Sequence, residues 1–303
     1  MNLNHVRAFI AVVETGSMSA AARLLGVSQP NVTKSIRALE ALYHVQLVQR
    51  TTTGIVTTRY GQSLFAHAKV AHSELVKAEH ELGELAGHDA GAVSLGCGPV
   101  VAHLLVPPAI ATFREQYPAS DIRIVEGFSH TLVPLVRDET IDFAVAVKLA
   151  DFQNDGGVSF RPLFVQERVV VARKGHPLTK ARSLADLEHA SWLTFEPRAL
   201  LERDLVAHGL AKPNPVIQCE SHSGFLSLLE SSDMVGILPR NVLSKPSVMG
   251  DGLRALDLVE KLPSLTVGLF LRAGAPLTPA AAALARAMTA AGRKLARRNR
   301  TSR

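Results

Sequence analysis

The stretch that decides the fold, residues 17–40, reads SMSAAARLLGVSQPNVTKSIRALE. Ser17 or Ser19 can cap a first helix, because a serine hydroxyl accepts a hydrogen bond from the unpaired amides of a first turn. Gly26 can end that helix, because glycine adopts the left-handed conformation at little cost. Ser28 can then cap a second helix. The stretch therefore predicts two short helices joined by a tight turn.

Each predicted helix has an apolar face. Apolar residues recur at helical spacing, at Ala20, Ala21, Leu24 and Leu25 in the first helix and at Val32, Ile36, Leu39 and Tyr43 in the second. The opposite face of the second helix is polar and has no acidic residue before Glu40. Its side chains can bond to base edges or phosphates, and they are Gln29, Asn31, Thr33, Lys34 and Arg37. The pattern predicts a DNA recognition helix, and the alternative is a helical hairpin with an ordinary solvated face.

The stretch resembles the winged helix-turn-helix of the LysR-type transcriptional regulators. The positions that carry the resemblance are Ser17, Ala21-Ala22, Leu25, Ser28-Gln29-Pro30, Thr33, Ile36, Leu39-Glu40 and Arg50. The chain departs from the family pattern at Tyr43-His44 and Leu47-Val48, where the family usually has Leu-Gly and Leu-Phe. His44 must therefore close the recognition helix without the conformational freedom of glycine.

The flanking residues complete a winged helix-turn-helix domain predicted at 1–59. Apolar residues from Leu3 to Val13 fall at helical spacing and predict an initial helix, and Thr51–Thr57, bent at Gly54, predicts a β-hairpin wing. The predicted DNA-binding residues are Ser28, Gln29, Pro30, Asn31, Thr33, Lys34, Arg37, Arg50 and Thr52. For the wing threonines, plain β propensity is an equal alternative.

The formal net charge of +6 is concentrated at the two ends of the chain. Residues 1–60 contain six Lys or Arg against two Glu, and residues 293–303 contain six Lys or Arg and no acid. The region between them is therefore acidic. Positive charge at the N-terminus coincides with the predicted recognition helix, as phosphate binding requires. The basic C-terminus is expected to be a frayed solvated tail, with auxiliary contact to nucleic acid as the alternative.

The next segment, predicted at 60–88, is a linker and dimerisation helix. Its apolar residues alternate spacings of four and three, at Leu64, Ala68, Ala71, Leu75, Ala78, Leu82 and Leu85. A helix over residues 60–86 would span roughly 40 Å, and so narrow an apolar stripe cannot bury itself. The pattern predicts a coiled-coil dimer, which would read operators with two-fold symmetry.

Residues 89–303 alternate strands with helices, which predicts an α/β domain with a mainly parallel sheet. This region also resembles the LysR-type pattern, whose effector domain is two-lobed and similar to periplasmic solute-binding proteins. The matching pieces are Gly96, Leu105, Pro107, Phe113, Tyr117-Pro118, Ile141–Ala144, His176–Leu178 and Gly236–Pro239. The resemblance implies one lobe at about 89–162 with 267–303, and a second at about 163–266.

The family resemblance also implies a small effector bound between the lobes, expected to be a small organic acid, aromatic acids included. Candidate contacts lie at the carboxyl ends of strands, where such sheets bind ligands: Gly98, Pro99, Val100, Phe128, Ser129, His130, Thr194, Phe195, Ser221 and His222. Helix N-terminal amides there could hold an anion. For each single Ser, Thr or His, a structural role is the alternative.

No pattern in the sequence favours an enzyme, a cofactor or a metal site. There is no phosphate loop, no His-Glu-x-x-His and no nucleophile elbow. The chain has no apolar run of roughly 20 residues and no signal peptide, so the prediction is a cytoplasmic protein without a membrane partner. The partners implied are an operator in double-stranded DNA, a small effector, a second copy in a homodimer or homotetramer, and RNA polymerase. Two alternatives remain: a redox-responsive regulator acting through Cys97 and Cys219, and a solute-carrier module that does not bind DNA.

Overall fold

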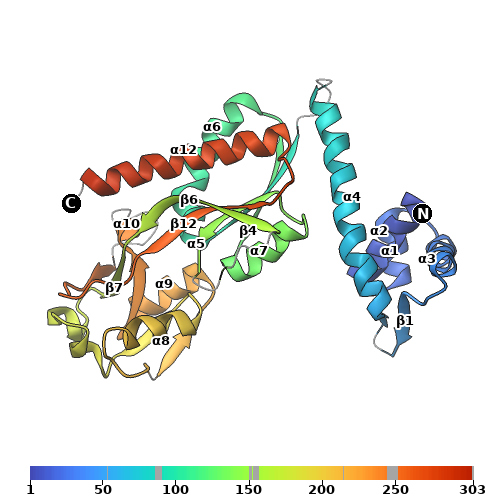
Figure 1. Cartoon of the computed structure of the whole chain (residues 1–303). Helices are drawn as coiled ribbons and strands as arrows, with labels where there is room; N and C mark the ends of the chain where they lie inside the picture. The colour runs from blue at the N-terminus through green and yellow to red at the C-terminus, as the bar shows by residue number, and fades with distance from the viewer. Residues whose placement is uncertain are drawn as a thin grey trace. The chain divides into compact units, whose positions relative to one another are not determined.

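The computed structural model describes residues 1–52, 54–85, 91–149, 152, 157–213, 215–243 and 252–301. The chain divides into two compact units, Met1–Gly91 with Arg137–Thr140, and Ala92–Val136 with Ile141–Arg303 (Figure 1). None of the described helices is both long enough and apolar enough to cross a membrane.

The first unit contains three short helices, a β-hairpin and one long helix. In chain order they are α1 (Leu3–Thr15), α2 (Met18–Leu25), α3 (Gln29–Tyr43), β1 (Val48–Thr51), β2 (Gly54–Thr57) and α4 (Arg59–Leu85). The predicted bounds of α2 are confirmed: the Ser17 hydroxyl accepts a hydrogen bond from the Ala20 amide, and Gly26 ends the helix with φ of 66°. Ser28 precedes α3 as predicted, but its side chain forms no capping hydrogen bond. The predicted wing is the antiparallel pair β1–β2.

One detail of the helix-turn-helix differs from the expectation, and one agrees with it. The helical spacing predicts Leu24 and Tyr43 on buried faces, but they are 65% and 46% exposed. From α2 the core of this unit takes Met18, Ala22 and the predicted Ala21, and the predicted Leu25 packs against it partly buried. His44 adopts a left-handed conformation with φ of 53°, so α3 ends there without a glycine.

The second unit contains two five-stranded sheets. The first has the order β4-β3-β5-β12-β6 and the second the order β11-β7-β10-β8-β9. Its strands are β3 (Ala92–Cys97), β4 (Asp121–Glu126), β5 (Phe143–Val147), β6 (Val158–Gln166), β7 (Arg168–Arg173), β8 (Ser191–Thr194), β9 (Val216–Gln218), β10 (Met234–Pro239), β11 (Leu253–Ala255) and β12 (Leu265–Arg272).

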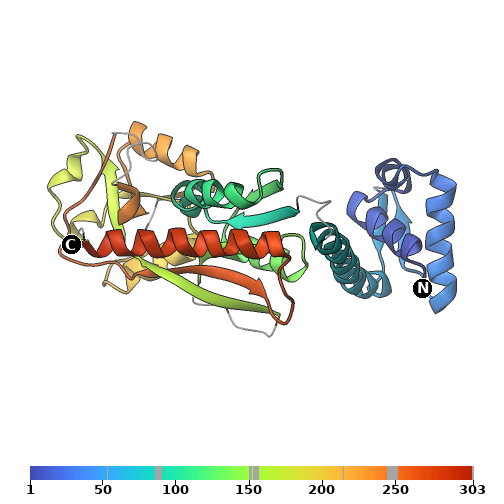
Figure 2. The same ribbon diagram turned by 90° about the horizontal axis from the view of Figure 1, so that it is seen from above.

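Helices cover both sheets. They are α5 (Pro99–Leu104), α6 (Val106–Gln116), α7 (Ser129–Arg137), α8 (Arg198–Val206), α9 (His222–Ser231), α10 (Arg240–Leu243) and α12 (Pro279–Thr301), with short 3₁₀ helices at Pro177–Lys180 and Ala185–Leu187. Figures 1 and 2 show α12 beside α6 and along β6, in agreement with the contacts among these elements. The chain is therefore helical through Thr301 where the sequence predicts a frayed tail, and the basic residues Arg293, Lys294, Arg297 and Arg298 are exposed, as expected for a solvated segment.

The sheets are mixed, so the expectation of a mainly parallel sheet is also wrong. Strand β3 pairs in parallel with β4 and β5, whereas β12 is antiparallel to both β5 and β6. The reason is that β6 and β12 carry the chain between the sheets in opposite directions. Strand β6 stays in the first sheet as far as Gln166, paired with Leu265. The change of sheet therefore comes after Gln166 and not at 162–163.

Candidate functional site

The polar face of α3 is exposed and free of internal partners. Gln29, Asn31, Lys34 and Arg37 are exposed, and Thr33 is half-buried. Within the described residues, the side chains of these five form no hydrogen bond or ion pair. Val32, Ile36 and Leu39 on the opposite face are at most 2% exposed, so the orientation of the helix is fixed by its core. The face can therefore contact a partner without breaking a contact of its own.

The acidic residue at the end of this face points into the fold. The Glu40 Oε1 accepts hydrogen bonds from the Leu47 and Val48 amides, at 2.8 and 3.4 Å, and so holds the segment that leads into the wing. The wing is held from the other side by the Ile55 amide, which donates to the Gly16 carbonyl at 2.9 Å. With Glu40 turned inward, the exposed side chains described on α3 and the wing include no acidic residue, although Leu42, Tyr43 and Val56 are also exposed there.

The remaining predicted DNA-binding residues also lie on the surface. They are Ser28, Pro30, Arg50 and Thr52, and all four are exposed. Ser28 precedes α3 with extended backbone but makes no side-chain capping bond, so its hydroxyl is available to an outside acceptor.

The apolar residues at heptad spacing along α4, from Leu64 to Leu85, form a seam that divides into a packed part and an exposed part. Ala68 is buried against Val6 and Ile10 of α1, and Leu64 packs on the core of the same unit. Leu75 and Leu82 are 42% and 67% exposed. The exposed part of the seam is Ala71, Leu75, Ala78 and Leu82, and the Leu85 side chain lies outside the described part of the chain.

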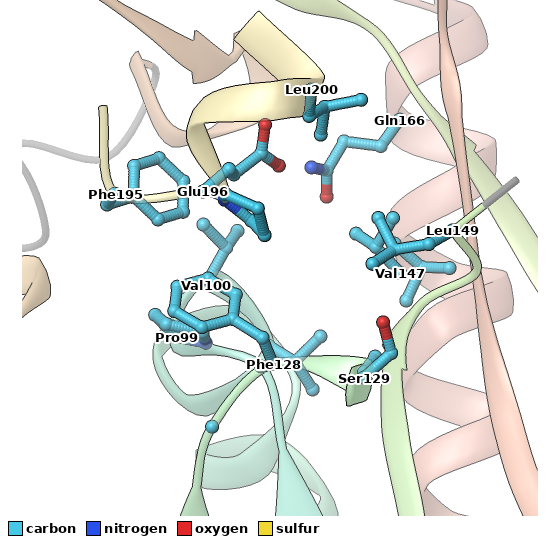
Figure 3. A pocket seen from close by; sticks show the side chains of 16 residues that line it. Pro99, Val100, Phe128, Ser129, Val147, Leu149, Gln166, Phe195, Glu196 and Leu200 are labelled. Atoms are coloured by element: carbon cyan, nitrogen blue, oxygen red, sulfur yellow. The ribbon is translucent and has the colours of Figure 1, made fainter. Parts of the chain in front are cut away.

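The second unit holds a pocket of about 510 Å³ of space not filled by protein, part of it open to solvent. Strand ends of both sheets contribute to its lining (Figure 3). The lining residues are Gly98, Pro99, Val100, Val101, Gly127, Phe128, Ser129, Ala146, Val147, Leu149, Gln166, Phe195, Glu196, Pro197, Leu200 and Val267. Six of the ten predicted effector contacts are among them: Gly98, Pro99, Val100, Phe128, Ser129 and Phe195.

The other four predicted contacts, His130, Thr194, Ser221 and His222, are not lining residues. Ser221 caps α9 by accepting from the Gly224 amide at 3.2 Å. His130 is exposed and stacks on Phe128. His222 is 4% exposed, and its ring contacts His103 and Phe195. Burial, and then the nearby His103, lower the pKa of His222 to about 4, so its imidazole is neutral.

Thr194 has a positioning role, because it shapes the turn that carries Glu196. Its hydroxyl donates to the Glu196 carbonyl at 3.0 Å and accepts from the Glu196 amide at 3.1 Å. This local turn follows the buried strand β8 and brings the Glu196 side chain to the pocket, where Figure 3 shows it on the same side of the cavity as Gln166. No pattern in the sequence singles out Gln166 or Glu196, although Glu196 directly follows the predicted Thr194-Phe195.

Two carboxylates share one buried guanidinium behind the pocket. The Arg168 Nη2 lies 2.6 Å from the Asp204 Oδ2, and its Nη1 lies 3.5 Å from the Glu196 Oε2. The Arg168 Nε and Nη2 also donate to the Pro263 carbonyl. Burial is the main cause that raises the pKa of Glu196 to about 7; Asp204 raises it further, while Arg168 and Arg203 lower it. Glu196 is thus the weakly paired member of the cluster.

The cysteines do not favour the redox alternative. Cys97 is buried, and burial, assisted by Glu126, raises its pKa to about 12. The thiolate is the reactive form, so it is scarce on Cys97 at neutral pH. Cys219 is partly buried, and its thiol lies 3.6 Å from the Ser221 carbonyl.

Comparison with known proteins finds a matching family model in each of the two units. Residues 3–62 match the model of the bacterial regulatory helix-turn-helix protein, lysR family, and residues 86–293 match the LysR substrate binding domain. The chain is 30% identical over 280 residues to the HTH-type transcriptional regulator PcaQ of Agrobacterium fabrum, covering 90% of this chain and 89% of PcaQ. It is 29% identical over 299 residues to GbpR of Azospirillum brasilense, covering 96% and 86%.

Solved structures of similar proteins show the same fold. A full-length variant of OxyR from Pseudomonas aeruginosa aligns with a TM-score of 0.68 at 20% identity, covering 97% of this chain and 98% of that one. CbnR, described as a LysR family transcriptional regulator, aligns with a TM-score of 0.67 at 19% identity, covering 96% and 99%. Together with the two family models, these findings confirm the resemblance seen in the sequence: the chain belongs to the LysR family of bacterial transcriptional regulators.

Proposed function

We propose that this LysR-type regulator reads its operator with the polar face of α3 and the adjoining wing, and that a small molecule in the pocket of the second unit controls this binding. The observation that carries the proposal is the exposed, acid-free and unpartnered set Gln29, Asn31, Lys34 and Arg37. Gln and Asn can bond bidentately to adenine, and Lys and Arg can bond to guanine or phosphate. In this proposal DNA reading belongs to residues 1–59 and effector binding to 89–303.

The pocket supports the effector half of the proposal because both sheets contribute to it. Gly98 and Phe128 follow strands of the first sheet, and Phe195 follows β8 of the second. A ligand that touches both can change how the sheets are held together, which gives it differential affinity for two arrangements. The sequence predicts a small organic acid as the effector. The charges of the lining weigh against that prediction, because no Lys, Arg or His is among the described lining residues.

The exposed half of the α4 seam supports a dimer, over the segment 60–88. Ala71, Leu75, Ala78 and Leu82 continue the heptad spacing along a face that the unit itself does not cover. We infer that a second copy covers it, in a homodimer or a homotetramer. A two-fold dimer presents two α3 helices to two operator half-sites.

The test is binding of the purified full chain to the DNA upstream of its own gene, measured across a salt series by fluorescence anisotropy. Each phosphate contact that is lost should lower the salt slope by about 0.9, and each base contact that is lost should cost about 1–3 kcal/mol. We therefore expect Lys34→Ala and Arg37→Ala to weaken operator binding about tenfold. Their fold should be unchanged, because neither side chain has an internal partner.

Arg123→Ala is the matched control, because it removes the same charge from an exposed position on β4 in the other unit. It should leave operator affinity and salt slope unchanged. Wild-type binding no tighter than to random DNA would overturn the operator proposal. Unchanged affinity in the α3 variants would overturn the assignment of that face.

A further inference from the structure

The pocket is apolar with a single charged group. Most of its described lining is apolar, and Glu196 is the only charged residue among it. The Phe128 and Phe195 rings lie on one side, with centroids 6.1 Å apart, and Val147 and Leu149 lie across from them (Figure 3). Such a lining fits a small aromatic or alicyclic body.

Glu196 keeps unused capacity to accept hydrogen bonds. The Arg168 guanidinium is committed to Asp204 at 2.6 Å and to the Pro263 carbonyl, so only its Nη1 faces Glu196, at 3.5 Å. Arg203 pairs with Asp204 from the surface at 3.3 Å. The Asp204 charge is thus matched, and the Glu196 carboxylate is the acceptor left facing the cavity. A carboxylate has about four lone-pair sites, and one long contact fills few of them.

Gln166 is a second polar group without a partner. Its side chain lines the pocket although the residue is only 3% exposed, and it forms no side-chain hydrogen bond within the described residues. Figure 3 shows its amide on the same side of the cavity as the Glu196 carboxylate. The Gln166 amide atoms are not among the fully enclosed unpaired atoms of the described residues, so they are reachable from the cavity, where a ligand can form hydrogen bonds with them.

We propose that the effector is a small, mainly apolar amine, whose ammonium group lies between the Glu196 carboxylate and the Gln166 amide oxygen. This inference rests on the proposed function, since it names the ligand class of the same pocket. The ammonium supplies the positive charge that the lining lacks, and its three N–H donors match the available acceptors. The apolar body then lies against Phe128, Phe195 and the aliphatic side chains.

The pH dependence of binding follows from the protonation of Glu196. The charged groups that face it are Arg168 of β7 and Asp204 and Arg203 of α8. Its raised pKa of about 7 means that an ammonium must displace the carboxyl proton at lower pH. Amine affinity should therefore rise as pH rises, by up to tenfold per pH unit below about 7, and level off above it. A carboxylate ligand would show the opposite trend.

The experiment is calorimetric titration of the full chain with benzylamine and 2-phenylethylamine, against benzoate, phenylacetate and benzyl alcohol as probes of similar size. We expect the amines to bind more tightly than the acids and the alcohol, and Glu196→Gln to weaken amine binding at least tenfold. Glu188→Gln is the control, because it removes an exposed carboxylate of the same unit and should change nothing. The pH series on the wild type provides a test that does not depend on the folding of a variant.

The outcomes separate this inference from the proposed function. Absence of amine binding, equal or tighter binding of the acids, or an amine affinity indifferent to Glu196→Gln and to pH would overturn the amine class. Operator binding measured on the same preparation would then show whether the regulator proposal survives. Amine binding without operator binding would uphold the ligand class and overturn DNA reading.

Discussion

Replacing Glu196 with Gln should change how the stability of the second unit depends on pH. In the folded chain, burial raises the pKa of Glu196 to about 7, from an ordinary value of 4.5. The folded state therefore keeps the carboxyl proton at pH values where the unfolded state has lost it. The stability contributed by the neutral form is fully present below pH 4.5 and is lost as the pH rises through about 7.

The size of the change in stability follows from the difference between the pKa of Glu196 in the unfolded and folded states. At about 1.4 kcal/mol per pH unit, the interval from 4.5 to about 7 corresponds to about 3 kcal/mol of unfolding free energy. Gln resembles the protonated carboxyl and does not titrate. We therefore expect Glu196→Gln to match the wild type near pH 4.5 and to be more stable by up to about 3 kcal/mol at about pH 8.

Urea unfolding followed by tryptophan fluorescence can measure this difference. Trp192 is the only tryptophan of the chain, is 1% exposed, and belongs to the same core cluster as Leu201 and Leu205 of α8. His222 has the opposite effect on the pH dependence of stability, because its pKa is lowered in the folded chain. The contribution of its neutral imidazole to the unfolding free energy is lost as the pH falls below 6.5. The difference between variant and wild type at each pH removes that contribution. A flat difference between pH 5 and 8, or one that also occurs in Glu188→Gln, would refute the reasoning.

Two further predictions concern the first unit. A Cβ added at Gly61 would lie 2.0 Å from the Leu47 carbonyl oxygen, so Gly61→Ala should destabilise this unit by about 1–3 kcal/mol in thermal unfolding. Gly292→Ala, where the nearest atom is 3.4 Å away, is the tolerated control, and equal losses in both variants would contradict the clash. Leu75→Glu should dissociate the dimer in sedimentation velocity, because it places a charge in the exposed seam. Ala66→Glu, exposed on the opposite side of the heptad, should not; a dimer that persists in Leu75→Glu would argue against the α4 interface.

The sequence predicts the helix-turn-helix well because its signals are local. The cap at Ser17 and the left-handed turn at Gly26 depend only on neighbouring residues, and both are present in the structure. Burial is predicted less well, since periodicity alone places Leu24 and Tyr43 inside the core, where the structure does not. Which side of a short helix is buried depends on where its neighbours lie, and the sequence pattern does not contain that information.

The residues of the pocket are harder to predict from the sequence, because they come from elements that are far apart along the chain. The glycine and aromatic residues that the sequence places at strand ends, Gly98, Phe128 and Phe195, do line the pocket, because turns after strands have recognisable compositions; their contact with an effector stays a prediction. The sequence does not predict Gln166 and Glu196 as pocket residues. They are 30 positions apart, and they line the same pocket only because the ends of β6 and β8 both lie beside it. The sequence does not predict the helix α8, which carries Asp204 behind the pocket, either. Its buried residues are Leu200, Leu201, Asp204 and Leu205, so an aspartate interrupts the apolar pattern and no clean helical periodicity marks the helix.

The predicted pH profile and the proposed ligand class have one physical cause. An ionised Glu196 is costly in the free protein mainly because it is buried, and the Arg168 guanidinium, which is already bound to Asp204, offsets only part of that cost. Proteins retain such unfavourable groups mainly where a function requires them. An amine that binds there supplies the missing positive charge, so it should stabilise the second unit more at pH 8 than at pH 5. In Glu196→Gln the amine should raise the unfolding free energy of the second unit only slightly at both pH values. If the amine stabilised that variant as much as the wild type at pH 8, the Glu196 carboxylate would have no part in binding. The cost of ionising Glu196 would then not indicate an amine as the ligand.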